Sequence, residues 1–259
     1  MKTKQFKLLS FIFVLGLFVF SACDDVSEPD SQSAEDDARG SYIMADAFAV
    51  SDAEAGSGGK SLVIDGMTVE RDIQNPMSFT LVFDNCDYRG SVRNGKIHVT
   101  YSVPDPDTPR AVNVNITFED YTMDGVKVEG SMASVFGGTI DIPEINIVAT
   151  GMKATFPDGK FISWSSAQKF RIVEGYDDGN PLTNVMEVSG TTEGINRAGE
   201  SYVAVYSSVV TKGDCQYPVS GTVAVTSDKG ETIIDYGDGE CDDIISVTSS
   251  GVTVTIHLD

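Results

Sequence analysis

The excess of valine over leucine is the feature that most constrains how this chain can fold. Residues 23–259 contain 27 Val but only four Leu. Branching at Cβ restricts the χ1 rotamers of a side chain and favours strands, whereas helices usually build their apolar faces from Leu and Ala. The body of the chain is therefore predicted to be all-β.

Turn signals recur between short apolar runs from Ser61 onward. Val112–Phe118 and Val252–Ile256 alternate apolar with polar residues, which places the apolar side chains on one face of a sheet. Asp-Gly and Asn-Gly pairs supply the positive φ angles of tight hairpin turns. We expect antiparallel sheets joined by hairpins over residues 61–259, and a meander, a sandwich and a rolled sheet all fit. The turn pairs are Asp65-Gly66, Asn94-Gly95, Asp124-Gly125 and Asp158-Gly159.

The first 22 residues have the form of a secretory signal. Lys2, Lys4 and Lys7 make a basic start, and Leu8–Phe20 is an apolar run of thirteen residues. A helix that crosses a bilayer needs about 20 apolar residues, so this run fits the core of a signal peptide better than a membrane span. We expect residues 1–22 to be removed during export.

The signal ends in Phe20-Ser21-Ala22-Cys23, which resembles the lipobox of bacterial lipoproteins. The resemblance implies a diacylglycerol on the Cys23 sulfur, cleavage before Cys23, and acylation of the new amino group, for example with palmitate. Phe20 stands where Leu is usual in the motif. An ordinary signal peptide followed by a chance Cys is the alternative. The acyl chains would hold the protein on a membrane, and no transmembrane helix is expected after Cys23.

Residues 23–60 differ in composition from the rest of the chain. The stretch from residue 24 to residue 60 holds ten acidic and two basic residues among many Ser, Ala and Gly. Such a segment buries too little apolar surface to offset the entropy lost on ordering. We expect most of it to be a flexible acidic tether. Ser41–Val50 is apolar enough for a first strand or a short helix, and the sequence does not choose between them.

A strong acidic charge narrows the classes of partner. Removal of the signal, which holds three Lys and no acidic residue, leaves 15 basic and 39 acidic residues and a net charge of −24. Such a surface repels phosphate backbones and anionic lipid headgroups, so the charge argues against nucleic-acid binding. It is compatible with a solvated surface, with cationic ligands and with divalent ions.

Several segments resemble lipoproteins of the Bacteroidota. Asp24, Asp25 and Glu28 resemble the surface-export signal of that group, which implies an outer-membrane lipoprotein exposed at the cell surface. A periplasm-facing lipoprotein is the alternative. Residues 86–95, 121–130 and 235–243 look like parts of uncharacterised Bacteroidota lipoproteins, with similarity over most of residues 78–258. This resemblance implies a common β fold, but no activity and no functional residues.

The sequence singles out no catalytic residue. Triad hydrolysis needs a His beside a nucleophile, yet His98 and His257 both sit in strand-like runs without a nucleophile motif. We interpret them as sheet residues. The Cys and His spacings do not fit a zinc site. Carboxylate pairs of the kind that glycosidases use stay open, because acidic residues occur throughout the chain.

Four acidic residues form the best calcium candidate. Asp238, Glu240 and Asp242 have the i, i+2, i+4 spacing of an EF-hand start, with Asp243 after them. Position six of such a loop would be Asp243 instead of Gly, and position twelve Ser249 instead of Glu. A plain acidic turn is the favoured interpretation, so no cofactor is assigned and calcium stays a weak alternative. Residues 177–180 are a weaker candidate of the same kind.

Trp164, with Phe161 and Tyr176 nearby in the sequence, is a candidate platform for sugar stacking. A lone Trp in a β protein is more often part of the core, and we favour that interpretation.

A disulfide between Cys215 and Cys241 is predicted. Export would place the thiols in an oxidising compartment. Residues 217–226 and 231–236 read as two strands around a turn at residues 227–230, and both Cys lie thirteen residues from Asp228 at its centre. Opposed residues in a hairpin bring their Cβ atoms within about 5 Å, near the separation that a disulfide tolerates. Cys86 should remain a free, buried thiol.

Two functions remain compatible with the sequence. The first is a membrane-anchored, non-enzymatic module for binding a glycan or protein, or for envelope structure. The alternative is a carboxylate- or calcium-dependent hydrolase that acts on glycans. The first is favoured because the sequence shows neither a His beside a nucleophile nor a recognisable catalytic motif.

Overall fold

The computed structural model describes residues 30–56, 64–88, 90–102, 112–139, 143–178 and 183–258. Within these residues thirteen strands form one antiparallel sheet in which every strand pairs with its neighbours in sequence. The architecture is therefore a meander, one of the three arrangements that the turn pattern allowed. The strands are β1 (Met67–Arg71), β2 (Ser78–Tyr88), β3 (Ser91–Ser102), β4 (Asn113–Met123), β5 (Val126–Gly138), β6 (Pro143–Thr155), β7 (Phe161–Glu174), β8 (Val185–Ile195), β9 (Ser201–Lys212), β10 (Ser220–Ser227), β11 (Gly230–Asp238), β12 (Ile244–Ser249) and β13 (Val252–His257).

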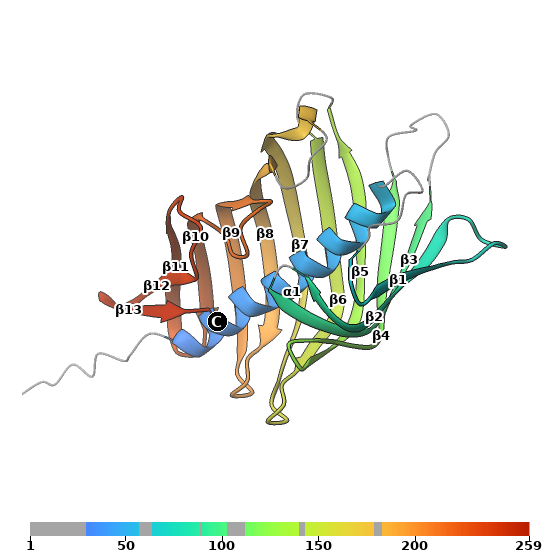
Figure 1. Cartoon of the computed structure of the whole chain (residues 1–259). Coiled ribbons are helices and arrows are strands. Elements are labelled where there is room, and N and C mark those ends of the chain that lie inside the picture. Colours follow the sequence, from blue (N-terminus) through green and yellow to red (C-terminus); the bar gives the residue numbers. More distant parts are fainter. Residues whose placement is uncertain are drawn as a thin grey trace, which may run out of the picture.

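One long helix, α1 (Ser31–Gly56), lies across the inner face of this sheet. Figure 1 shows α1 running obliquely from the side of β9–β11 towards the side of β1–β3, with the sheet curved around it. A short 3-10 helix, η1 (Tyr176–Asp178), follows β7. Among the described residues, no helix is both long and apolar enough to cross a bilayer.

The helix corrects our expectation for residues 23–60. Residues 31–56 form a 26-residue helix instead of a flexible tether, and Ser41–Val50 lies in its central part. Ala34, Ala38, Ile43 and Met44 are buried against the sheet. Buried Asp and Glu side chains of the helix meet basic and hydroxyl groups of the strands. The composition argument failed because these partners come from distant parts of the chain. Residues 1–29, with the predicted signal and Cys23, lie outside the described residues.

The curvature of the sheet has a local cause in β-bulges. Register shifts interrupt most of the strand pairs, and each bulge bends and twists its strand. Gly95 and Gly190 occupy such shifts with positive φ angles of 89° and 138°. A Cβ on either would lie 2.2 Å from a carbonyl oxygen of the neighbouring strand, so only glycine fits.

Three of the predicted turns are confirmed and one is wrong. Asp124-Gly125 joins β4 to β5, Asp158-Gly159 lies between β6 and β7, and residues 228–229 join β10 to β11. Asn94-Gly95, in contrast, is a bulge inside β3, because Gly95 packs directly on the backbone of Asp120 in β4. Asp65-Gly66 is a turn before β1, but the strand expected before it falls in residues 57–63, outside the described part.

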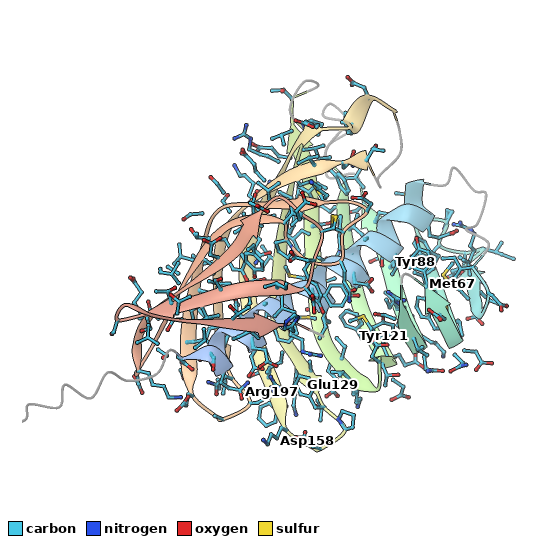
Figure 2. The ribbon with its side chains drawn as sticks, turned by 60° about the vertical axis from the view of Figure 1, so that its left-hand side comes forward. Met67, Tyr88, Tyr121, Glu129, Asp158 and Arg197 are labelled. Atoms are coloured by element: carbon cyan, nitrogen blue, oxygen red, sulfur yellow. A yellow bond between two sulfur atoms is a disulfide. The ribbon has the colours of Figure 1, made fainter. Side chains whose placement is uncertain are left out.

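The core lies between α1 and the inner face of the sheet. Alternate residues of each strand point inward, as in β6, where Ile145, Ile147 and Ala149 are buried. Trp164 of β7 packs under the helix, where a Cβ on Gly40 would lie 3.4 Å from its ring. Gly40 therefore allows the helix to approach the indole closely. Figure 2 shows the side chains on both sides of the ribbon.

Candidate functional site

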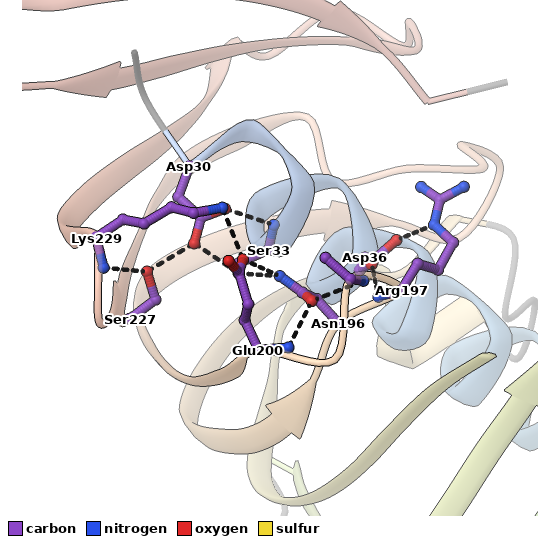
Figure 3. Close-up of polar contacts among 9 residues, drawn as sticks. Asp30, Ser33, Asp36, Asn196, Arg197, Glu200, Ser227 and Lys229 are labelled. Carbon is purple, nitrogen blue, oxygen red and sulfur yellow. Dashed lines mark hydrogen bonds and ion pairs between the residues drawn. The ribbon is translucent and has the colours of Figure 1, made fainter. Parts of the chain in front are cut away.

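The first turn of α1 is held by a polar cluster at the ends of four strands (Figure 3). Asp30 caps the helix by accepting the Ser33 backbone N–H at 3.2 Å. Ser227 Oγ donates to Asp30 Oδ2 at 2.6 Å, and Asn196 Nδ2 donates to Ser33 Oγ at 2.9 Å. Burial raises the pKa of Asp30, but the hydrogen bonds from Ser227 and Ser33 outweigh it and leave the pKa below its ordinary value. Asp30 is therefore a carboxylate that ties α1 to two turns.

Arg197 makes the second attachment of the helix. Its backbone N–H donates to Asp36 Oδ2 at 2.7 Å, and its Nε donates to Asp36 Oδ1 at 2.6 Å. The same guanidinium reaches Glu35 and stacks over Phe156, with 4.9 Å from its central carbon to the ring centroid. The β8–β9 turn thus closes on one side of α1.

The second turn of α1 contains a carboxyl, that of Asp37, with no cation beside it among the described residues. Asp37 is 1% exposed, and its Oδ2 accepts a hydrogen bond from Tyr206 at 2.6 Å. Burial raises the pKa of Asp37 to about 7, against the opposing effect of this hydrogen bond. In the described structure neither Asp37 Oδ1 nor the Tyr236 hydroxyl has a hydrogen-bond partner. Ionisation of Asp37 is therefore costly while the helix is docked.

The second half of α1 is attached by two arginines. Arg93 of β3 is fully buried, and its Nη2 and Nε donate to the Asp46 oxygens at 2.6 and 3.2 Å. Its Nη1 donates to the carbonyl oxygens of Tyr88 and Ser91. Near the end of the helix, Arg71 of β1 pairs with Glu54. The attachments thus extend along the whole of α1, and the sheet face beneath it is occupied.

These perturbed groups are suited to hold the helix and not to act on a substrate. Asp37 and Arg93 lie between α1 and the sheet, where their side chains are buried. Catalytic acids and bases need access to a reacting group. Sequence reasoning missed Asp37, Arg93 and Arg197. The only available signal was the acidic run Glu35-Asp36-Asp37, which was assigned to the flexible tether.

The outer face of the sheet carries an apolar stripe that sequence reasoning also missed. Seven residues from β5 to β11 pair across consecutive strands, and six of them are Ala, Val or Ile. Val148 is 49% exposed and Val205 43%. At about 4.8 Å per strand the stripe is about 29 Å long. We call Ala133, Val148, Ala167, Thr191, Val205, Ala224 and Ile233 the outer stripe.

The surroundings of the outer stripe are polar but mostly uncharged. Among the described residues two positions to either side along each strand, only Lys169, Glu193, Glu231 and Asp235 are charged, and most others are Ser, Thr or Asn. A shallow depression beside the stripe is lined by Ser165, Glu193, Val203 and their neighbours. The signal for the stripe was present in Tyr202–Tyr206, where both faces of one strand are apolar or aromatic.

The predicted disulfide is confirmed. Cys215 and Cys241 are bonded, with 5.4 Å between their Cα atoms. They lie beyond the paired strands, in the β9–β10 and β11–β12 connections. The register of β10 and β11 pairs Val223 with Ile234 and shifts near Ser220, which keeps the two connections adjacent. Closing a loop of this size stabilises by about 3–4 kcal/mol in the chain-entropy model. Cys86 is a free, buried thiol, as expected.

Both histidines are sheet residues on the outer face. His98 Nδ1 lies 3.0 Å from Thr80 Oγ1, and its Nε2 lies 2.8 Å from Glu119 Oε2, while Lys96 binds Oε1 of the same carboxylate. The order Thr, His and carboxylate is that of a triad. The cluster is, however, about half exposed on an open sheet face, without the enclosure that activates a nucleophile. His257 pairs with Asp243 at 3.0 Å.

The calcium candidates do not converge. Asp242 accepts the backbone N–H of Ile244, and Asp243 pairs with His257. Among the described residues, the one group of three close ligand atoms is Asp214, Cys215 and Cys241, whose two sulfurs are already bonded to each other. The other acidic candidates, Asp238 and Glu240, are exposed, as is Asp177; Gly179 and Asn180 lie outside the described residues.

The aromatic platform does not form. Trp164 is 4% exposed and faces α1, which confirms the interpretation of it as a core residue. Phe161 is exposed on the outer face beside Lys153, and Tyr176 lies beyond the other end of β7 in η1.

Comparison with known proteins gives no relative: no family model, no curated protein and no solved structure matches the chain significantly.

Proposed function

We propose that this chain is an exported, lipid-anchored module of the outer membrane that binds a protein partner through the outer stripe and performs no catalysis itself. The observation that carries the proposal is the stripe: an exposed apolar row about 29 Å long on a protein whose mature charge is −24. Contiguous exposed apolar surface rimmed by polar residues marks interaction sites.

Other features support this function. α1 fills the inner face, so the outer face is the broad sheet surface open to a partner. An aromatic row, which glycan stacking would use, is replaced on the stripe by Val and Ala. A disulfide persists in compartments outside the cytoplasm, which agrees with export.

The anchoring half of the proposal predicts a mature protein that begins at acylated Cys23. Intact-mass measurement should find loss of residues 1–22 and the added mass of acyl chains, and detergent partitioning should place the protein in the detergent phase. Cys23→Ala should stay in the aqueous phase because it lacks the acceptor sulfur. Equal masses and equal partitioning of the two proteins as soluble species would contradict the anchor.

The binding half predicts protection of the outer stripe in cells. Val205→Cys should react with a small maleimide that crosses the outer membrane when the protein is pure, and should react several-fold more slowly in intact cells. Thr255→Cys, exposed on the same face but away from the stripe, should react equally in both. The parent, in which buried Cys86 is the only free thiol among the described residues, gives the background. If the rate for Val205→Cys relative to Thr255→Cys is the same in cells as in solution, the stripe is unoccupied and the proposal fails.

A further inference from the structure

The meander places its connections at two opposite ends of the sheet. The β2–β3, β4–β5, β6–β7, β8–β9, β10–β11 and β12–β13 turns lie at one end, which we call the near rim. The remaining connections between consecutive strands form the far rim. Asp158 and Arg197, labelled in Figure 2, belong to the near rim.

Helix α1 begins at the near rim. Asp30 accepts hydrogen bonds from Ser227, next to the β10–β11 turn, and Ser33 accepts one from Asn196 of the β8–β9 turn. Figure 3 shows the first turn of the helix between these two turns. The chain therefore enters the described structure at this end of the sheet.

The length of chain before Asp30 limits where a membrane can lie. The following argument rests on the proposed acylation of Cys23. Seven residue steps separate Cys23 from Asp30, and a chain of that length spans at most about 25 Å. The strand β9 has 12 residues, so it is about 40 Å long and separates the rims by that distance. With the far rim on the membrane, α1 would begin farther from the surface than its anchor can reach.

The two rims also differ in charge. The described connections of the far rim hold seven acidic residues and no basic one, namely Asp72, Asp177, Asp178, Asp214, Glu240, Asp242 and Asp243. Those of the near rim hold four acidic residues, Asp124, Asp158, Glu200 and Asp228, against three basic ones, Lys160, Arg197 and Lys229. Anionic headgroups repel acidic segments over about a Debye length. The charge distribution thus favours placing the near rim on the membrane, as does the length of the chain before Asp30.

We propose that the near rim faces the lipid surface to which Cys23 is attached. The strands then stand upright on the membrane, and the acidic far rim with its disulfide points away from it. The outer stripe, which crosses the strands, runs parallel to the membrane and stays open to a partner from the side.

Energy transfer to labelled lipids tests this orientation. The acylated full-length protein is placed on phosphatidylcholine vesicles with phosphatidylglycerol and an acceptor-labelled lipid. One donor dye is attached at Ala198→Cys on the near rim and, in a second protein, at Asp177→Cys on the far rim; both positions are exposed. Because the rims lie about 40 Å apart, transfer should be roughly twofold or more higher from position 198.

Two separate failures are distinguishable in this experiment. Equal transfer from the two positions would mean a side-on molecule, and higher transfer from position 177 an inverted one; either result overturns the orientation while the anchor stands. Flotation with the vesicles is measured first. If the wild type does not float, or if Cys23→Ala floats equally well, the proposed anchor is wrong and the orientation falls with it.

Discussion

Arg93→Met should lower the free energy of unfolding by about 3–5 kcal/mol, the cost of removing one partner from a buried ion pair. Arg93 is fully buried, and its guanidinium donates to both oxygens of Asp46 and to the carbonyl oxygens of Tyr88 and Ser91. The substitution takes away the cation and leaves the Asp46 carboxylate under α1. Urea unfolding of the purified protein at neutral pH measures the change.

Two controls separate the buried pair from general effects of lost charge. Lys127→Met removes the cation of the exposed Lys127–Glu129 pair, and should change stability by less than about 1 kcal/mol. The double variant Arg93→Met with Asp46→Leu should recover much of the loss, because no unpaired charge remains buried. If Arg93→Met costs no more than Lys127→Met, the pair does not hold the helix.

Asp37→Asn should remove a pH dependence from the stability of the protein. The pKa of Asp37 is about 7 in the folded state, against an ordinary value of 3.8. Between these values the folded protein binds more protons than the unfolded one, so stability falls as the pH rises through this window and levels off above about 7. At 1.36 kcal/mol per pKa unit, the full loss is roughly 4 kcal/mol.

The surroundings of Asp37 explain this direction. Tyr206 and Tyr202 of β9 and Tyr236 of β11 face it, with Asp36 next to it on the helix. None of the tyrosines offers a positive charge, and Arg197 is engaged by Asp36 and Glu35. The carboxylate form of Asp37 is therefore uncompensated, whereas an Asn can keep the hydrogen bond from Tyr206.

Denaturant unfolding every half pH unit from 4 to 8 measures the difference between wild type and Asp37→Asn. The difference removes the contributions of all other titrating groups. The variant should gain stability over the wild type as the pH rises, and Asp228→Asn, in an exposed turn, should run parallel to the wild type. If the stability of Asp37→Asn also ran parallel to that of the wild type across this pH range, Asp37 would not be the group that causes the pH dependence.

The sequence by itself determined the class of fold and several local features. Val is abundant and Leu is rare, and the branching of Val at Cβ restricts χ1 and favours strands. The Asp124-Gly125 and Asp158-Gly159 pairs adopt the backbone angles of hairpin turns. The disulfide was predictable because Cys215 and Cys241 lie at equal distances in sequence from a tight turn. In an antiparallel hairpin such residues lie opposite each other and therefore close together.

Only the tertiary structure decided the rest. Asn94-Gly95 has the chemistry of a turn, but the neighbouring backbone of Asp120 makes it a bulge. The acidic segment before β1 becomes a helix because Arg93, Arg197 and Tyr206 hold Asp46, Asp36 and Asp37 across 47, 161 and 169 residues. The outer stripe exists because the register aligns single Val and Ala residues from separate strands. Local propensity carries no information on such distant partners, since their energies arise only when the sheet brings them together.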